Sequence, residues 1–312
     1  MEEAKQWPQR LLLWYAAVRR DLPWRRTSEP YRIWVSEMML QQTRVETVKA
    51  YYKRFLERFP DVQALADAPE SDVLKCWEGL GYYSRARNMQ KTAKRIASEY
   101  KGIFPKTAAE LVLLPGIGEY TAGAVASIAF HEPVPAIDGN VKRVMSRILG
   151  IRQPLSQPSA LLLMKNALSK AIPADQPGEF NQALMELGAT HCKSTVPECD
   201  LCPLAGFCDA YAEGDANTLP IKEGKRPPKT VDVTVNIITC GKRVLLMRRS
   251  EKLLHGLYVF MLTEGDSHAQ QSQAALQDAG LHVCWMEDCG EATHQFTHRL
   301  WQMHIRHFLF TK

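Results

Sequence analysis

The sequence has no apolar run long enough to span a membrane, no internal repeat and no strong excess of charge of either sign. The apolar segment 11–18 is bracketed by charged residues and lacks a small-residue cleavage site, so it indicates neither an anchor nor a signal peptide. The 39 basic and 34 acidic residues give a net charge of +5, which permits a polyanionic partner without requiring one. We therefore expect a soluble, cytoplasmic, monomeric protein, associated with the nucleoid if it is bacterial.

Half of the eight cysteines gather in one short segment. Cys192, Cys199, Cys202 and Cys208 have the spacing C-x6-C-x2-C-x5-C. Zinc sites usually use two short knuckles, whereas here only the middle pair is one, and this asymmetry favours a [4Fe–4S] cluster held by four thiolates. Structural zinc and unrelated buried thiols are the alternatives. The other cysteines show no grouping and are expected to be small buried hydrophobes: Cys76, Cys240, Cys284 and Cys289.

The chain changes character after Tyr211. Before it, apolar residues recur with helical spacing at Trp7, Leu11, Trp14 and Val18, and again over 45–59, 86–100 and 161–171. Residues 213–229 are rich in glycine, proline and charge, which predicts a linker that includes the basic residues Lys222, Lys225, Arg226 and Lys229. Beyond it, 231–239 and 243–247 predict a β-hairpin that turns near Gly241. We thus expect a mainly α domain over 1–212 and an α/β domain over 230–312.

The segment Leu114-Pro115-Gly116-Ile117-Gly118 separates two helical patterns, 107–113 and 120–130. This arrangement predicts a helix-hairpin-helix. Glycines at both positions would permit positive φ and bring backbone N–H groups close to a phosphate at the start of the following helix. A simple αα-hairpin, with glycines only for the turn, is the alternative.

Two carboxylates occupy contrasting positions. Asp138 directly precedes the helical pattern 141–148 and is placed to cap it, which would hold the carboxylate ionised. Glu37 lies in the apolar stretch IWVSEMML, where desolvation would raise its pKa. One carboxyl that donates a proton beside one that stays charged is a pattern of acid catalysis. An exposed helix residue is the alternative for Glu37.

Together, SEMMLQQT around Glu37, LPGIG, IDGNVKRV around Asp138 and the four cysteines resemble the helix-hairpin-helix DNA glycosylases that carry an iron–sulfur cluster. LPWRR at 22–26, GLGYYSRARN at 79–88 and the second domain make the chain most similar to the MutY-type adenine DNA glycosylases within this endonuclease III-like superfamily. The resemblance, over about 22–298, implies a six-helix barrel and an iron–sulfur helical subdomain. It also implies base excision repair of adenine opposite 8-oxoguanine or guanine in double-stranded DNA.

The resemblance also implies roles for individual residues. Glu37 would protonate adenine and Asp138 would stabilise the oxocarbenium ion. Tyr120 stands where strand-cleaving relatives carry a nucleophilic lysine, which implies a monofunctional enzyme. Gln42 and Tyr82 would enter the base stack, while Arg25 and Gln182 would hold the extruded adenine, although the family often has glutamate at the latter position. The hairpin glycines Gly116 and Gly118, together with Asn140 and Lys142, would contact DNA.

The second domain resembles a Nudix fold without the carboxylate-rich Nudix box, so pyrophosphate hydrolysis is not expected. Phe296, Thr297 and His298 match the loop by which the family recognises 8-oxoguanine. Relatives usually continue past Lys312, so we expect a shortened domain whose terminal strand, 303–310, has an uncovered edge or apolar face. The alternative functions are an endonuclease III-like glycosylase for oxidised pyrimidines and a non-enzymatic iron–sulfur DNA-binding or electron-transfer protein.

Overall fold

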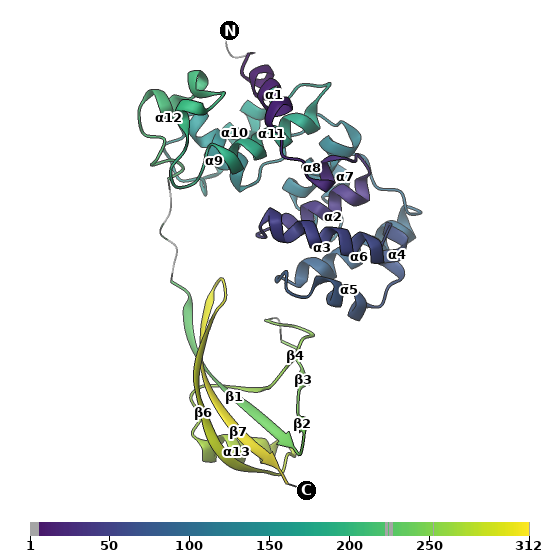
Figure 1. Ribbon diagram of the computed structural model, residues 1–312, viewed down its shortest axis with the longest axis vertical. Coiled ribbons are helices and arrows are strands. Elements are labelled where there is room, and N and C mark those ends of the chain that lie inside the picture. The colour runs from purple at the N-terminus through teal and green to yellow at the C-terminus, as the bar shows by residue number, and fades with distance from the viewer. Residues whose placement is uncertain (1–5, 222–223, 225–226, 252, 312) are drawn as a thin grey trace. The chain divides into compact units, whose positions relative to one another are not determined.

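The computed structural model describes residues 6–221, 224, 227–251 and 253–311. It divides into two compact units, residues 1–223 and 224–312. In its described residues the first unit is helical, and the second combines a mixed sheet with one helix (Figure 1). The expected mainly α domain followed by an α/β domain is thus confirmed. Of the predicted linker, Lys222, Glu223, Lys225 and Arg226 lie outside the described residues, whereas Leu219 is buried in the first unit.

No helix of the described residues is long and apolar enough to cross a membrane. The helices of the first unit are α1 (Gln6–Val18), α2 (Pro30–Leu40), α3 (Val45–Arg58), α4 (Val62–Asp67), α5 (Glu70–Trp77), α6 (Ser84–Glu99), α7 (Ala108–Leu111), α8 (Glu119–Phe130), α9 (Gly139–Ile148), α10 (Pro158–Ala171), α11 (Pro177–Thr190) and α12 (Asp209–Ala212), with 3-10 turns η2 (Pro23–Arg25), η3 (Cys199–Leu201) and η4 (Ala205–Phe207).

The helical periods predicted α3, α6 and α10 to within three residues of their observed ends. The helical spacing of Trp7, Leu11, Trp14 and Val18 is confirmed by α1, although Val18 is 49% exposed and Tyr15 is buried. The buried residues of this helix are Pro8, Leu11 and Tyr15, which follow the three- and four-residue spacing of a helical stripe.

Two apolar cores lie side by side in the first unit. One core is formed mainly by α2 to α8 and contains Trp34, Phe55 and Trp77, all fully buried. The other is formed by α1, α9, α10 and α11 and contains Met145 and Phe180. Helix α11 also packs on α8, so the two cores meet along these two helices. Residues at this seam can therefore be held rigidly from both sides.

Helices α7 and α8, with the turn between them, form the helix-hairpin-helix. A capping box formed by Thr107 and Glu110 begins α7. Gly116 has a φ of 74°, and a Cβ there would lie 2.5 Å from the Cβ of Asn88. The expectation of positive φ at both glycines was wrong for Gly118, which has a φ of −88° and serves as the N-cap of α8. An N-cap residue normally has extended backbone, so this position needs no left-handed conformation.

The sheet of the second unit has the strand order β2-β1-β7-β6, with β5 also paired to β1. Strand β7 runs parallel to β1 and antiparallel to β6. Helix α13 covers part of the sheet and packs Leu276 against Ile238 and Phe308. The elements are β1 (Lys229–Cys240), β2 (Arg243–Val244), β3 (Met247–Arg248), β4 (Tyr258–Val259), β5 (Met261–Glu264), α13 (Ala269–Asp278), β6 (Val283–Gln295) and β7 (Arg299–Phe310).

Three expectations for this unit need correction. The hairpin turns after Cys240 as predicted, but its second strand ends at Val244, and Met247 pairs with β4 instead. Of the two alternatives for the terminal strand β7, the uncovered edge is wrong over most of its length, because β1 and β6 pair with its two sides. Cys240, Cys284 and Cys289 are exposed rather than buried, since they lie at the end of β1 and on the largely exposed strand β6.

The two hairpin glycines should differ in their tolerance of a side chain. We expect Gly116→Ala to lower the free energy of unfolding by about 1–2 kcal/mol or more, because alanine is disfavoured at positive φ and its Cβ would meet Asn88. Gly118→Ala is the matched control, since its backbone is extended and nothing lies within 4 Å of the added Cβ. Urea unfolding of both variants measures the difference, and equal losses would contradict this account of the turn.

Candidate active site

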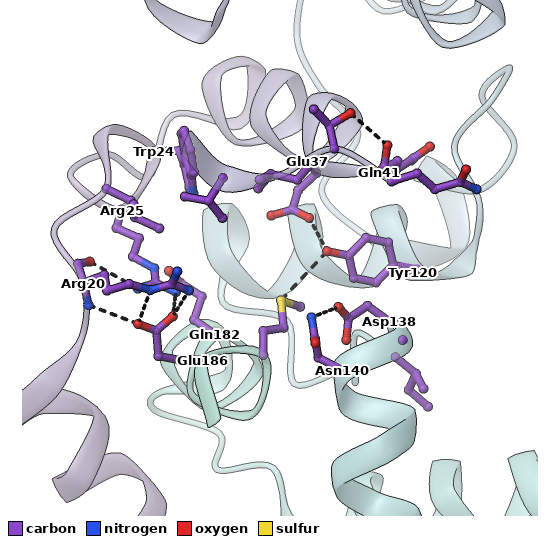
Figure 2. A pocket seen from close by; sticks show the side chains of 18 of the residues that line it. Arg20, Trp24, Arg25, Glu37, Gln41, Tyr120, Asp138, Asn140, Gln182 and Glu186 are labelled. Atoms are coloured by element: carbon purple, nitrogen blue, oxygen red, sulfur yellow. Dashed lines mark hydrogen bonds and ion pairs between the residues drawn. The ribbon is translucent and has the colours of Figure 1, made fainter. Parts of the chain in front are cut away.

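A cavity of about 510 Å³ opens where the two helical cores meet (Figure 2). Helices α2 and α8 contribute to it from one core, and α9 and α11 from the other. The structure brings eight of the predicted site residues to this cavity: Arg25, Glu37, Gln42, Tyr120, Asp138, Asn140, Lys142 and Gln182.

Glu37 projects from the last turns of α2 into the cavity (Figure 2). The helix is fixed at its start by Glu29, whose carboxylate accepts hydrogen bonds from the backbone N–H groups of Tyr31 and Arg32. The Glu37 side chain is 5% exposed, and its burial raises its pKa to about 7. The hydrogen bond from Tyr120 opposes this rise, while the charge of Asp138 adds to it. Glu37 can therefore hold a proton near neutral pH, as expected.

Asp138 is the N-cap of α9, as predicted. Its carboxylate accepts hydrogen bonds from the backbone N–H of Val141 at 2.7 Å and from the side-chain amide of Asn140 at 2.8 Å. Burial raises the pKa of Asp138, while these hydrogen bonds oppose the rise. The two carboxyls thus differ in hydrogen bonding, whereas both are desolvated.

Tyr120, the second residue of α8, links the hairpin to the acid. Its hydroxyl donates a hydrogen bond to Oε2 of Glu37 and lies 3.8 Å from the Sδ of Met185. Burial raises the pKa of Tyr120 well above its ordinary value, and the nearby carboxyls add to the rise. The hydroxyl therefore remains a neutral donor and holds the Glu37 carboxyl in one orientation.

A buried ion cluster forms one wall of the cavity. Glu186 on α11 is 1% exposed and accepts hydrogen bonds from Arg20 at 2.7 and 2.8 Å and from Arg25 at 2.8 Å. Burial opposes ionisation, but the two guanidinium groups hold the pKa of Glu186 at about 2. Arg25 also lies 5.4 Å from the centre of the Tyr15 ring, and the Tyr15 hydroxyl donates to Oε1 of Gln182 at 3.3 Å.

A second chain of contacts runs from Asp138 toward the cysteines. Asn140 accepts a hydrogen bond from Arg143 at 2.9 Å, and Arg143 also donates to the carbonyl oxygens of Cys192 and Gly188 at 2.8 and 2.7 Å. Helix α11 approaches this close because residue 188 is glycine, where a Cβ would lie 2.6 Å from the Cβ of Asn140. The guanidinium of Arg143 thus links Asn140, at the start of α9, to the cysteine segment.

The four clustered cysteines line one small cavity near Arg147, and none is in a disulfide. The guanidinium of Arg147 is buried and donates to Sγ of Cys192 at 3.1 Å and to the carbonyl oxygen of Leu219 at 3.0 Å. Its Nη2 is buried without a hydrogen-bond partner. Backbone N–H groups point at two more sulfurs, from Leu204 to Cys202 and from Ala210 and Tyr211 to Cys208.

Three groups of predicted residues lie outside the cavity lining. Tyr82 is 49% exposed and has a φ of 48°. Gln42, which does line the cavity, is also exposed and has a φ of 58°. The hairpin glycines precede α8 and do not line the cavity. In the second unit, Phe296 packs between His294 and Trp301, with ring centres 4.5 and 4.9 Å away. Thr297 and His298 are exposed in the turn between β6 and β7.

Sequence comparison agrees with this arrangement. Residues 35–167 match the HhH-GPD superfamily of base excision DNA repair proteins. The chain is 36% identical to adenine DNA glycosylase of Mus musculus, over 92% of this chain and 67% of that protein. It is 41% identical to adenine DNA glycosylase of Buchnera aphidicola subsp. Baizongia pistaciae, over 71% of this chain and 64% of that protein. The chain belongs to the adenine DNA glycosylase family.

Two solved structures also match about two thirds of the chain. A thermostable thymine-DNA glycosylase is 26% identical, with a TM-score of 0.62, and the match covers 68% of this chain and 98% of that one. Endonuclease III in a trapped covalent complex with DNA is 25% identical, with a TM-score of 0.58 over 68% of this chain and 97% of that one. Among adenine DNA glycosylases, the chain spans about half to two thirds of the length of the relatives that it matches.

Residues Tyr15, Arg20, Glu186 and Met185 were missed by the sequence analysis. The last two follow Gln182 by four and three residues on α11, so helical spacing alone places them on the face that Gln182 presents to the cavity. That spacing was the available signal. No local pattern could have paired Glu186 with Arg25, because 161 residues separate them.

The Glu186 cluster should contribute measurably to stability. We expect Glu186→Gln to lower the free energy of unfolding by about 2–3 kcal/mol at pH 7, because the variant leaves two guanidinium groups without their counter-ion. A lowered pKa stabilises above the ordinary pKa of a carboxyl, so the deficit should shrink as the pH falls below about 4 and toward 2. Urea unfolding at pH 7 and pH 3 measures this. The control is Glu57→Gln on α3, whose side chain is 64% exposed.

Proposed function

We propose that the chain is a monofunctional adenine DNA glycosylase of base excision repair, which removes adenine paired with 8-oxoguanine or guanine. The observation that carries this proposal is the pair of desolvated carboxyls, Glu37 and Asp138, on one cavity beside Tyr120. A tyrosine cannot form the imine through which a lysine nucleophile cleaves the strand. Lys142 also lines the cavity, and we assign it to a DNA phosphate.

Glu37 acts as the general acid. Adenine is a poor leaving group, so its ring must gain a proton as the glycosidic bond lengthens. With a pKa of about 7, the Glu37 carboxyl is protonated in a large fraction of molecules at neutral pH and is still acidic enough to transfer the proton to N7. The Tyr120 hydroxyl bonds to one carboxyl oxygen and so keeps the other directed at the base.

Asp138 stabilises the positive charge that develops on the deoxyribose as the base leaves. The hydrogen bonds from Val141 and Asn140 fix its carboxylate at the start of α9. A carboxylate in this position stabilises the oxocarbenium ion electrostatically or captures the anomeric carbon transiently before water adds. The burial that raises its pKa also strengthens its interaction with a cation in the cavity.

The extruded adenine is held by the wall around Glu186. Gln182 presents an amide whose oxygen accepts from Tyr15 and whose nitrogen can donate to a ring nitrogen of the base. The Tyr15 hydroxyl thus helps to fix the orientation of the Gln182 amide. Arg25 is held against Glu186 at the same wall. Removing the base from the duplex costs a few kcal/mol, and Gln42 and Tyr82 offset this cost by filling the stack.

The hairpin and the start of α9 bind the DNA backbone. Gly116 keeps the turn free of a side chain, and α8 begins directly after Gly118 with its N–H groups available to an anion.

In the second unit, Thr297 and His298 supply hydrogen-bonding groups at the turn between β6 and β7, with Phe296 beside them. We assign these three residues to recognition of 8-oxoguanine.

Cys192, Cys199, Cys202 and Cys208 would hold a [4Fe–4S] cluster. Among the described residues, no three His, Cys, Asp or Glu side chains converge as ligands of one metal ion would. The four thiolates would instead each bind one iron of the cluster. The partnerless Nη2 of Arg147 and the N–H groups directed at the sulfurs suit an anionic occupant. When bound, the cluster would supply folding energy to the loop that presents Lys193.

The cluster assignment predicts an iron content that depends on these cysteines alone. Protein purified without oxygen should contain about four irons and four sulfides per chain. Cys202→Ser should lose most of this iron and lower the melting temperature, because the thiolate bonds contribute to folding. Cys240→Ser, at an exposed and ungrouped position, is the control. One zinc per chain, or iron content unaffected by Cys202→Ser, would refute the assignment.

The function is tested by single-turnover base release from duplexes with adenine opposite 8-oxoguanine, guanine or thymine, with and without alkali. We expect alkali-dependent cleavage of the first two. Glu37→Gln should lower the rate by at least about a hundredfold while duplex binding persists. Release of oxidised pyrimidines would favour the endonuclease III-like alternative, and tight binding without release of any base would favour a binding protein.

The same assay at subsaturating protein should show an acid-dependent rate. The raised pKa of Glu37 means that the active, protonated form is present below about pH 7, so the rate should fall about tenfold per unit at higher pH. A rate that is flat between pH 7 and pH 9 would exclude Glu37 as the proton donor.

A further inference from the structure

Arg85 is a buried arginine that joins two separate turns of the chain. It is the second residue of α6 and is 7% exposed. One nitrogen, Nη1, donates to the carbonyl oxygens of Met38, Met39 and Gln41 at 2.6–2.9 Å. The other, Nη2, donates to the hydroxyl of Thr43 and to the carbonyl oxygens of Leu80 and Gly81 at 3.2–3.3 Å. One guanidinium therefore ties the end of α2 to the turn before α6.

Each of the two turns carries an exposed side chain on a left-handed residue. These residues are Gln42, with a φ of 58°, and Tyr82, with a φ of 48°. Non-glycine residues rarely adopt this conformation, and they keep it only where the surroundings fix the backbone. The acceptors of Arg85 immediately flank both residues, at Gln41 and Thr43 on one side and at Gly81 on the other.

Among the described residues, no acidic side chain forms an ion pair with Arg85. The described residues show no salt bridge to it, and its partners are carbonyl and hydroxyl oxygens and the aromatic faces of Trp77 and Tyr82, 5.2 and 5.6 Å from the guanidinium. Burial lowers the pKa of Arg85 to about 10, so it stays charged at neutral pH. Carbonyl groups at the end of α2 carry the negative end of the helix dipole, which suits a cation.

We propose that Arg85 is the positioning residue for base extrusion: it fixes the backbone at Gln42 and at Tyr82, so that these two side chains open the duplex beside the catalytic cavity. This inference rests on the proposed function. Gln42 lines that cavity, and the neighbouring Gln41 is anchored to α8 through Thr121 at 3.2 Å. Lysine cannot replace the arginine, because its single ammonium offers three donors from one atom, whereas the two terminal nitrogens of the guanidinium make six contacts here.

The test compares Arg85→Lys with the unaltered protein on two substrates. One substrate has adenine paired with 8-oxoguanine, and the other has adenine opposite an abasic site, where less pairing opposes extrusion. We expect the single-turnover rate of Arg85→Lys to fall about tenfold or more on the first and less than about threefold on the second. Equal losses on both substrates, or no loss on either, would overturn the proposal. Arg58→Lys, in an exposed pair with Asp72, is the control.

A second readout separates this proposal from the glycosylase reaction. In proteins that carry Glu37→Gln, 2-aminopurine placed opposite 8-oxoguanine should brighten on binding, and adding Arg85→Lys should remove most of that increase at saturating protein. This signal does not require base release, so it tests Arg85 even if the unaltered protein proves inactive. If Arg85→Lys lowers the melting temperature below that of the assay, Thr43→Val is the second variant. It removes one acceptor of the guanidinium and should give a smaller loss of single-turnover rate, on the paired substrate alone. An unchanged fluorescence increase in both variants would overturn the proposal.

Discussion

The site depends on burial of the Glu37 carboxyl between two helical cores. Raising its pKa from 4.5 to about 7 corresponds to roughly 3 kcal/mol between the protonated and ionised forms. Because the pKa is raised, the protein is most stable with this group protonated, and it loses that stability as the pH rises through about 7. The packing of Trp34 and Met38 on the same helix must hold the carboxyl in place against this cost. A rigid α2 is thus a requirement of the proton transfer that we propose for Glu37.

The buried arginines of this unit serve opposite electrostatic purposes. Arg25 has a carboxylate partner in Glu186, so its charge is largely balanced before any substrate enters. Arg85 has only carbonyl, hydroxyl and aromatic partners, and Arg147 has carbonyl oxygens and a cysteine sulfur, with one nitrogen partnerless. A buried charge without a counter-ion is costly. Such a charge is retained where it organises backbone turns, as we propose for Arg85, or where it faces an anionic group, as we propose for Arg147 and the cluster.

Sequence reasoning succeeded where the determining interactions are local. The period of α3 and the cap at Asp138 depend on neighbouring residues, and the apolar stretch around Glu37 is itself local. It failed where the answer depends on distant contacts. The position of Tyr120 in the sequence gave no sign that its hydroxyl bonds to Glu37, which lies 83 residues earlier. The exposure of Cys284 was likewise decided by how its strand packs, whereas the backbone of Gly118 is set locally, by its position as the N-cap of α8.

The pKa of Asp138 shows how local and distant contributions combine at one group. A capped carboxylate at a helix terminus is stabilised by about 1 kcal/mol at an exposed site. At the seam between two cores, desolvation acts on the same group and exceeds that contribution, so the direction of the shift reverses. Desolvation arises only when α9 and α11 close on the cavity, with Gly188 against Asn140. In the proposed mechanism, the strength with which Asp138 stabilises a cation is therefore a property of the assembled fold, because a carboxylate stabilises a neighbouring cation most where water is excluded.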